Sequence, residues 1–343
     1  MPADPTPAAG GKPRVLSGIR PTGESFQLGN YVGAVRHWAA MQDENDCFFF
    51  LADLHALIDT PDPARLRTRT RESAAELLAL GIDPARSVLF AHSQVPEHAE
   101  LAWVLGCLTA FGEASRMTQF KDKGGGTVGL FTYPVLQAAD ILLYDAHAVP
   151  IGEDQRQHLE LTRDLAQRFN SRYGPTFTLP AAYAGRPGER IKDLQDPARK
   201  MSKSIGGPGT IWVLDEPKAL TKKIKSAVTD TGREVRADDA KPGVTNLLTI
   251  LSVVTGTPVP ELETAYEGKG YGDFKGDVAA AVVELFAPMR TRYIELVADP
   301  GHLDDVLAEG AQRASEVARR KLTAVREAVG LLPARAGATS TTG

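Results

Sequence analysis

The chain has 343 residues, of which 43% are hydrophobic and 24% charged, and its formal net charge at pH 7 is −4. These values are ordinary for a globular protein of one or two domains and exclude an overall basic field that attracts nucleic acid, although a local basic stripe could still bind it. The two cysteines, Cys47 and Cys107, match no zinc pattern or disulfide framework, which predicts a reducing, cytoplasmic environment. No apolar run approaches membrane-spanning length, so no membrane partner is expected.

Apolar runs and amphipathic segments alternate through the first two-thirds of the chain. Pro63 marks the first turn of one predicted helix, and Gly81 marks its end. Strands that alternate with helices predict an α/β fold with a parallel sheet covered on both faces, whose ligands bind beyond the carboxyl ends of the strands. The predicted strands are residues 15–19, 47–53, 87–93 and 148–151, and helices are predicted at residues 30–41 and 63–81.

Strand signals stop at about Asp215, and the rest of the chain has helical periodicity. The predicted organisation is an α/β domain at residues 14–215 followed by an all-helical domain at residues 216–332. The segments at residues 1–13 and 333–343 are polar and rich in small residues, and we expect them to be disordered tails.

A glycine-rich turn, RPTGESFQLGNYVG at residues 20–33, directly follows the first predicted strand. Such a turn serves either as a tight bend or as a contact for phosphate. Gly29 would let the backbone approach a nucleotide, and a helix from Asn30 would direct its N-terminal amides at negative charge. The chain contains no GxxxxGK[ST], HExxH or GxSxG sequence, which excludes P-loop, zinc protease and serine hydrolase sites.

A second motif, RKMSKSIGG at residues 199–207, favours the phosphate interpretation. A loop with three basic residues is usually only a solvated surface. However, the pentapeptide KMSKS resembles the signature loop of class I aminoacyl-tRNA synthetases, which activate an amino acid with ATP and pass it to tRNA. These enzymes have a HIGH-like turn after their first strand, and QLGN at residues 27–30 stands at that place.

Further segments narrow the resemblance. SGIRPTG, DLHAL, RMTQFKDK, TYPVLQAADILLY, VPIGEDQRQHLELTRDLAQRFN, KKIKSAVTD and EGKGYGDFK occur in this order, and together with KMSKS they resemble the bacterial-type tryptophanyl-tRNA synthetase family from about residue 15 to 329. The resemblance implies a Rossmann-like doubly wound catalytic domain with an inserted substrate and dimer segment, and an appended helical anticodon-binding domain. It also implies ATP carried with Mg²⁺, L-tryptophan and tRNA(Trp) as partners, a cytoplasmic location and a homodimer.

The resemblance assigns roles to individual residues and implies no protein-bound metal. Lys200, Ser202 and Lys203 would be catalytic, because the lysines would steady the departing pyrophosphate, and Lys121 or Lys123 would assist. Tyr133, Asp140 and Gln155 would bind tryptophan. ATP would contact Arg20, Pro21, Thr22, Gln27, Gly29, Asn30, Gly152, Glu153, Asp154, Ile191, Lys200, Met201, Ser202, Lys203 and Ser204.

Asp140 also stands out from the residue pattern itself. In a helix it shares a face with Leu136, Leu143 and Tyr144, and a carboxylate on an apolar face is costly unless it is paired or hydrogen-bonded. It is either a buried structural aspartate or, as the resemblance implies, the acceptor of the tryptophan indole N–H. The second interpretation is the one we favour.

Three lysines, Lys218, Lys222 and Lys225, are spaced at i, i+4 and i+7 on a predicted helix that begins near Asp215 and Pro217. Such a stripe is either a solvated face or, in a tRNA-binding protein, a track for phosphates.

Two alternatives stay open. A tyrosyl-specific class I synthetase would recognise a phenol hydroxyl in place of an indole N–H. A non-catalytic paralogue would act as a regulator or RNA binder, although the intact KMSKS, Asp140 and GEDQ at residues 152–155 argue against it.

The predicted site also departs from the family pattern in three places. Arg20 stands where many bacterial members have glutamine, and Gln27 where histidine or threonine is common, while the loop from Lys121 to Gly129 looks shorter. These clustered changes suggest the hypothesis of an inhibitor-tolerant auxiliary form. The guanidinium of Arg20 would face a neutral tryptophan mimic such as indolmycin as an unpaired charge.

Overall fold

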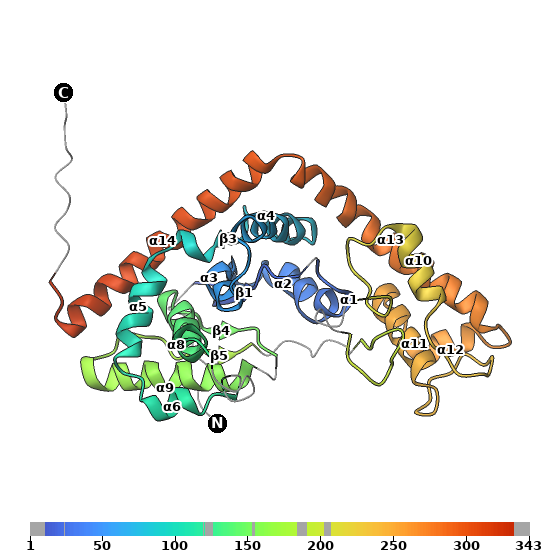
Figure 1. Ribbon diagram of the computed structural model, residues 1–343, viewed down its shortest axis with the longest axis horizontal. Coiled ribbons are helices and arrows are strands. Elements are labelled where there is room, and N and C mark those ends of the chain that lie inside the picture. The colour runs from blue at the N-terminus through green and yellow to red at the C-terminus, as the bar shows by residue number, and fades with distance from the viewer. Residues whose placement is uncertain are drawn as a thin grey trace.

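The computed structural model describes residues 11–23, 25–118, 120, 126–152, 155–183, 191–201 and 207–332 (Figure 1). Its centre is a five-stranded sheet in the order β3-β2-β1-β4-β5, in which all paired strands are parallel. Most of the two predicted tails, residues 1–10 and 333–343, lies outside the described residues. The strands are β1 (Arg14–Ile19), β2 (Asp46–Leu51), β3 (Val88–Ala91), β4 (Ala148–Val149) and β5 (Ala181–Ala182).

Helices cover both faces of the sheet, as the alternation of strands and helices predicts. The helices before residue 216 are α1 (Leu28–Asn30), α2 (Arg36–Met41), α3 (Asp53–Ala56), α4 (Pro63–Ala79), α5 (Glu97–Gly106), α6 (Phe111–Ser115), α8 (Val128–Leu143) and α9 (Arg156–Tyr173), with a π-helical turn at Tyr31–Val35 and 3₁₀ turns at Leu57–Asp59 and His92–Gln94. The later helices are α10 (Pro217–Lys225), α11 (Pro242–Thr255), α12 (Val259–Ala265), α13 (Tyr271–Val297) and α14 (Pro300–Val329).

The sheet separates two hydrophobic cores. Cys47 and Phe49 of β2 face a core shared with α2, α4 and the helices after residue 216, whereas Phe48 and Phe50 face a core shared with α5, α8, α9 and α14. This alternation along one strand is the pleat of a strand buried on both faces, and it explains why β2 reads as an unbroken apolar run. The predicted α/β fold with a Rossmann-like parallel sheet and a helical part is confirmed.

The last two helices run along the top of the molecule in Figure 1 and meet above α4. From there α14 returns to the sheet and packs on β3 and α5. Gly310 permits this close approach, because a Cβ at that position would lie 1.8 Å from the carbonyl oxygen of Leu89. The domain boundary predicted at residue 215 stays a prediction. Helix α14 comes after this boundary in sequence, but it packs on the sheet that comes before it.

Several elements differ from the sequence prediction. The helix predicted from Asn30 begins at Leu28, and β5 was not predicted. The strands predicted at residues 47–53, 87–93 and 148–151 end earlier, at Leu51, Ala91 and Val149. Very short strands carry almost no periodicity, because two residues cannot show an alternation.

No single helix in the described ranges is both long enough and apolar enough to cross a membrane. Only α11 and α12 taken together meet both conditions, and they are bent by 107° at the break between them.

Candidate active site

Several predicted site residues, and two histidines that were not predicted, lie just beyond the carboxyl ends of the parallel strands. Arg20 follows β1, while the unpredicted His55 is in the helix after β2 and the unpredicted His92 follows β3. Gly152 and Gln155 come shortly after β4. The strand order reverses between β1 and β4, and the carboxyl edge at such a switch point is where open α/β sheets bind ligands.

At the end of β1, Arg20 forms an ion pair with Asp59, which lies in the 3₁₀ turn after β2. Pro21 beside it is buried, and the backbone N–H of Thr22 donates to the carbonyl of Arg20 at 2.8 Å. The inhibitor-tolerance hypothesis assumes an unpaired guanidinium, but Asp59 already supplies a counter-charge. The hypothesis loses its main physical argument and stays an untested prediction.

The QLGN turn places Gln27 at the N-cap of α1. The backbone N–H of Leu28 donates to the carbonyl of Ile211 at 2.9 Å, so the first amide of the helix is occupied by the chain itself. Gly29 and Asn30 are partly exposed and lie over this turn, where a Cβ on Gly29 would come 3.1 Å from Oε1 of Gln27. Glycine at this position therefore leaves room for the Gln27 side chain.

The start of the KMSKS sequence lies next to this turn. Lys200 is exposed, whereas Met201 and Ile191 are each 1% exposed and belong to the hydrophobic core. A contact between Ile191 and adenine would therefore have to come from its backbone. Several predicted residues lie outside the described ranges: Lys121, Lys123, Glu153, Asp154, Ser202, Lys203 and Ser204.

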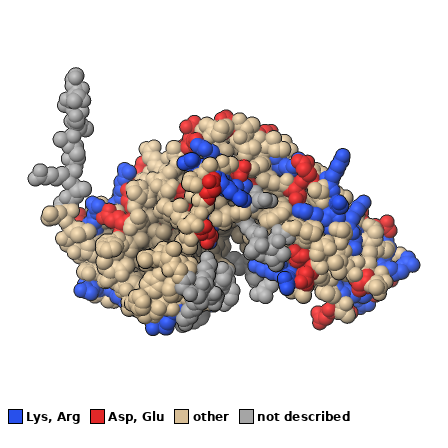
Figure 2. Space-filling view, viewed as in Figure 1, with Lys and Arg blue, Asp and Glu red and all other residues tan. Residues whose placement is uncertain are grey.

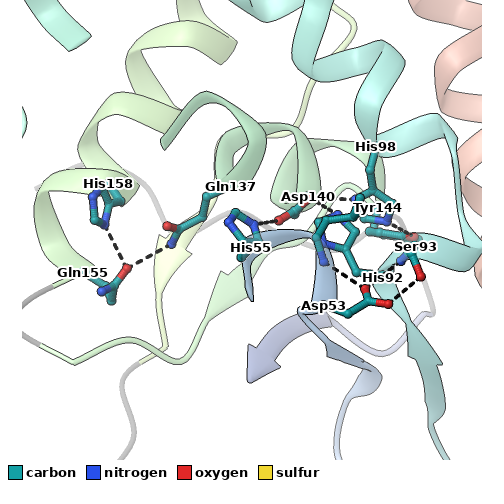
Figure 3. A network of polar contacts seen from close by, with 11 residues as sticks. Asp53, His55, His92, Ser93, His98, Gln137, Asp140, Tyr144, Gln155 and His158 are labelled. Atoms are coloured by element: carbon teal, nitrogen blue, oxygen red, sulfur yellow. Dashed lines mark hydrogen bonds and ion pairs between the residues drawn. The ribbon is translucent and has the colours of Figure 1, made fainter. Parts of the chain in front are cut away.

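Asp140 on α8 is 1% exposed and is surrounded by histidines (Figure 3). Its Oδ2 accepts a hydrogen bond from Nε2 of His55 at 2.8 Å, and its Oδ1 accepts from Nδ1 of His98 at 2.7 Å. His92 brings its Nε2 within 2.9 Å of the same Oδ1, but neither of its ring nitrogens forms a hydrogen bond among the described residues. The burial of the carboxylate is thus compensated, as the helix-face argument requires.

The histidines also fix the charge of this cluster. Burial raises the pKa of Asp140, but the imidazole of His92 and the hydrogen bonds from His55 and His98 outweigh it and hold the pKa well below its usual range. Burial lowers the pKa of His98, so its ring is neutral. Its Nδ1–H donates to Asp140, and its Nε2, 2.8 Å from the hydroxyl of Tyr144, accepts from that group. Asp140 is therefore an ionised acceptor held at both oxygens.

The same cluster is the group among the described residues that could hold a metal ion. One ligand atom from each of His55, His92 and Asp140 lies within 4.8 Å of the others. However, both carboxylate oxygens already accept hydrogen bonds from histidine, which favours a hydrogen-bonded network over an ion.

The other two predicted tryptophan ligands belong to a second network. The hydroxyl of Tyr133 lies 2.9 Å from Nε2 of His158, and Nδ1 of the same ring lies 2.8 Å from Oε1 of Gln155. An amide oxygen only accepts, so Nδ1 carries the proton and Nε2 accepts from Tyr133. Gln137 donates to the same Oε1 at 3.3 Å. The rings of His55 and Tyr133 lie 6.2 Å apart and bring the two networks together.

Sequence reasoning singled out none of the four histidines, although His55 belongs to the quoted segment DLHAL. Their positions carried a usable signal, because His55 and His92 each follow a predicted strand at the ligand-binding edge. His98 had no such signal, since its partner Asp140 is 42 residues away in sequence. His158 belongs to the quoted segment after β4 and bonds to the predicted Gln155 three residues away, but its bond to Tyr133 spans 25 residues.

A comparison with known families gives the class of protein to which this site belongs. Residues 8–287 match the family model of tRNA synthetases class I (W and Y), so the chain belongs to that family. It is 57% identical to tryptophan–tRNA ligase 2 of Streptomyces avermitilis over 95% of this chain and 99% of that protein. It is 54% identical to tryptophan–tRNA ligase of Corynebacterium glutamicum over 94% of this chain and 96% of that protein.

Solved structures agree with these relatives. The tryptophanyl-tRNA synthetase of Campylobacter jejuni, solved in complex with ADP and tryptophan, is 37% identical and superposes with a TM-score of 0.82 over 93% of this chain and all of that chain. The tryptophanyl-tRNA synthetase of Mycoplasma pneumoniae is 35% identical, with a TM-score of 0.82 over 94% of this chain and 98% of that chain.

Proposed function

We propose that this protein activates L-tryptophan with ATP and transfers it to tRNA(Trp). The observation that carries the proposal is the ionised, buried Asp140 at the carboxyl edge of the sheet, with both oxygens already oriented by His55 and His98. A carboxylate in this state accepts an indole N–H and discriminates against amino acids that lack one. The names of the two relatives reported above support tryptophan over the tyrosyl alternative.

In the proposed reaction, an oxygen of the tryptophan carboxylate attacks the α-phosphorus of ATP. The new O–P bond forms as the bond to the β-phosphate oxygen breaks, and pyrophosphate leaves with the Mg²⁺ that ATP carried. The terminal ribose hydroxyl of tRNA then attacks the adenylate carbonyl and releases AMP. No covalent nucleophile is needed, so the protein contributes by positioning and by stabilising charge through Lys200 and Lys203.

The direct test is aminoacylation of tRNA(Trp) with labelled tryptophan and, separately, with labelled tyrosine. Charging with tryptophan alone supports the proposal. Charging with tyrosine would assign the chain to the tyrosyl alternative. Because tRNA charging supplies translation, we assign the activity to the cytoplasm.

An exposed apolar patch supports the proposed homodimer. Trp103 on α5, Phe111 on α6 and Val128 on α8 are 75%, 77% and 77% exposed, and α8 packs against both other helices. The ring of Phe131 lies against that of Phe111 in a tilted arrangement at a centroid distance of 5.0 Å and extends the patch. Exposed apolar side chains on three helices that pack together mark an association surface, and a second copy of the chain is the proposed occupant.

Replacing Trp103 by glutamate is expected to weaken the dimer by about 30-fold or more, since a buried tryptophan at an interface centre contributes ~2 kcal/mol or more. Sedimentation velocity over a concentration series measures this shift. The matched control is Ile294→Glu, because Ile294 is 53% exposed on α13 outside the patch. If both variants sediment like the native protein, the patch is not the dimer interface.

The helical part is the proposed tRNA-binding part, residues 216–332. Lys218, Lys222 and Lys225 are all exposed on α10, and Figure 2 shows basic side chains gathered over this helix. By contrast, Lys223 between them donates to Asp215 at 2.7 Å and is partly buried. Lys223 thus has a structural ion pair, whereas the three exposed lysines present their charge to solvent, which supports a phosphate track.

Replacing the three exposed lysines by alanine is expected to lower kcat/KM for tRNA by about 10-fold or more at low salt. The slope of log affinity against log salt concentration should fall by about 2–3, since each lysine releases roughly one counterion. Tryptophan-dependent pyrophosphate exchange does not involve tRNA and should stay at the native rate. An unchanged salt slope would mean that the stripe is only a solvated face.

A further inference from the structure

The segment that leads into KMSKS folds back on itself. The N–H of Met201 donates to the carbonyl of Ile191 at 3.1 Å, and the N–H of Asp193 donates to the carbonyl of Arg199 at 3.0 Å. Between them, Lys192 and Lys200 form an antiparallel bridge. Hydrogen bonds to the strand around Lys192 therefore fix the position of the Lys200 backbone.

A buried asparagine from the helical part holds that strand. Asn246 on α11 is 4% exposed; its Oδ1 accepts from the N–H of Lys192 at 2.8 Å, and its Nδ2 donates to the carbonyl of Lys192 at 3.0 Å. A side-chain amide that uses both of its ends on one residue fixes both the place and the direction of that peptide strand.

A buried glutamine from the sheet domain holds the other strand. Gln27 is 3% exposed, and its Nε2 donates to the carbonyl of Met201 at 2.7 Å. The carbonyl can only accept, so it dictates the orientation of the amide. The amide oxygen, Oε1, is buried and has no hydrogen bond among the described residues. Burying this oxygen lowers stability, and the hydrogen bond from Nε2 to Met201 compensates for that loss.

We propose that Gln27 and Asn246 are positioning residues of the adenylation step. They form hydrogen bonds to the Ile191–Met201 segment from two sides and so fix the position of Lys200 relative to the QLGN turn. The inference rests on the proposed function and adds a physical link between its two signature motifs and the helical part. Charge stabilisation depends on donors that are already in place when charge develops, so a loosened segment should slow the chemical step more than substrate binding.

The test compares Gln27→Met and Asn246→Leu with the native enzyme in tryptophan-dependent pyrophosphate exchange. Each change keeps approximate side-chain size and removes the hydrogen bonds. We expect kcat to fall about 10–100-fold, as for one buried hydrogen bond left unmade, while KM for tryptophan stays within about twofold. Gln27→His, which restores an N–H donor, should recover most of kcat. Because both residues act on one segment, the double variant should lose less than the product of the two single effects.

The control is Asn45→Leu. Asn45 is 6% exposed and its Nδ2 donates to the carbonyl of Met41 at 2.9 Å, so it is an equally buried amide that does not touch the segment. It should lower the melting temperature but keep kcat. If Gln27→Met keeps the native kcat, or if Asn45→Leu loses as much kcat as Asn246→Leu, the inference is overturned. A native enzyme that catalyses no exchange at all would instead contradict the proposed function.

Discussion

Replacing Asp140 by alanine is expected to lower the ratio of kcat/KM for tryptophan over that for phenylalanine by about 10²–10⁴-fold. The reason is that a site built around one hydrogen bond discriminates by roughly 10⁴ or more against analogues without the donor. Asp140 is suited to this, since its pKa is held well below its usual range and the carboxylate is ionised at neutral pH. Pyrophosphate exchange with each amino acid gives both constants.

The substitution also removes the partner of His55 and His98, so the protein will lose stability as well. Glu97→Ala separates the two effects, because Glu97 is another buried carboxylate, paired at 2.9 Å with Arg319 of α14. We expect the control to lower the melting temperature and to keep the selectivity ratio. If the ratio is also unchanged in Asp140→Ala, Asp140 is a structural residue.

Replacing Lys203 by alanine should cut the rate of tryptophanyl-adenylate formation by about 10²–10³-fold, the loss expected for one charged donor aimed at charge in the transition state. The basis is the sequence, in which Lys203 is the second lysine of KMSKS. Tryptophan affinity, measured by fluorescence titration, should change little, because in the proposal Asp140 recognises tryptophan whereas Lys203 acts on the pyrophosphate.

Lys218→Ala is the matched control, since Lys218 is an exposed lysine on α10 and should not affect exchange without tRNA. Exchange kinetics of Lys203→Ala within a few-fold of the native protein would remove Lys203 from the catalytic step. An equal loss in tryptophan affinity and in rate would instead indicate a role in binding the ground state.

The sequence correctly predicted those structural features that depend on a single segment of the chain. The apolar runs predicted β1, β2 and β3, because parallel strands buried on both faces are apolar along their whole length. The spacing around Asp140 correctly predicted a buried carboxylate that needs partners. It could not say which partners, since His55 is 85 residues away and reaches Asp140 only once β2 and α8 are in place.

The features that were missed depend on contacts between distant segments. The position of α14 on β3 depends on Gly310 meeting the backbone of Leu89, and no local pattern encodes that approach. Likewise, Asn246 is a buried polar residue on the mostly apolar helix α11. Its role cannot be predicted from sequence, because its partner Lys192 is distant along the chain. The helix starts at Leu28, whose N–H donates to the carbonyl of Ile211, 183 residues further on, and no local pattern shows that contact.

The measurement that tests the central claim most directly is ATP–pyrophosphate exchange by the native protein with tryptophan or tyrosine as the only amino acid. The account predicts exchange that depends on tryptophan and that tyrosine does not support. Exchange supported by tyrosine would contradict the role given to Asp140. Binding of tryptophan with no exchange would favour a non-catalytic paralogue and contradict the assignment of an adenylating enzyme.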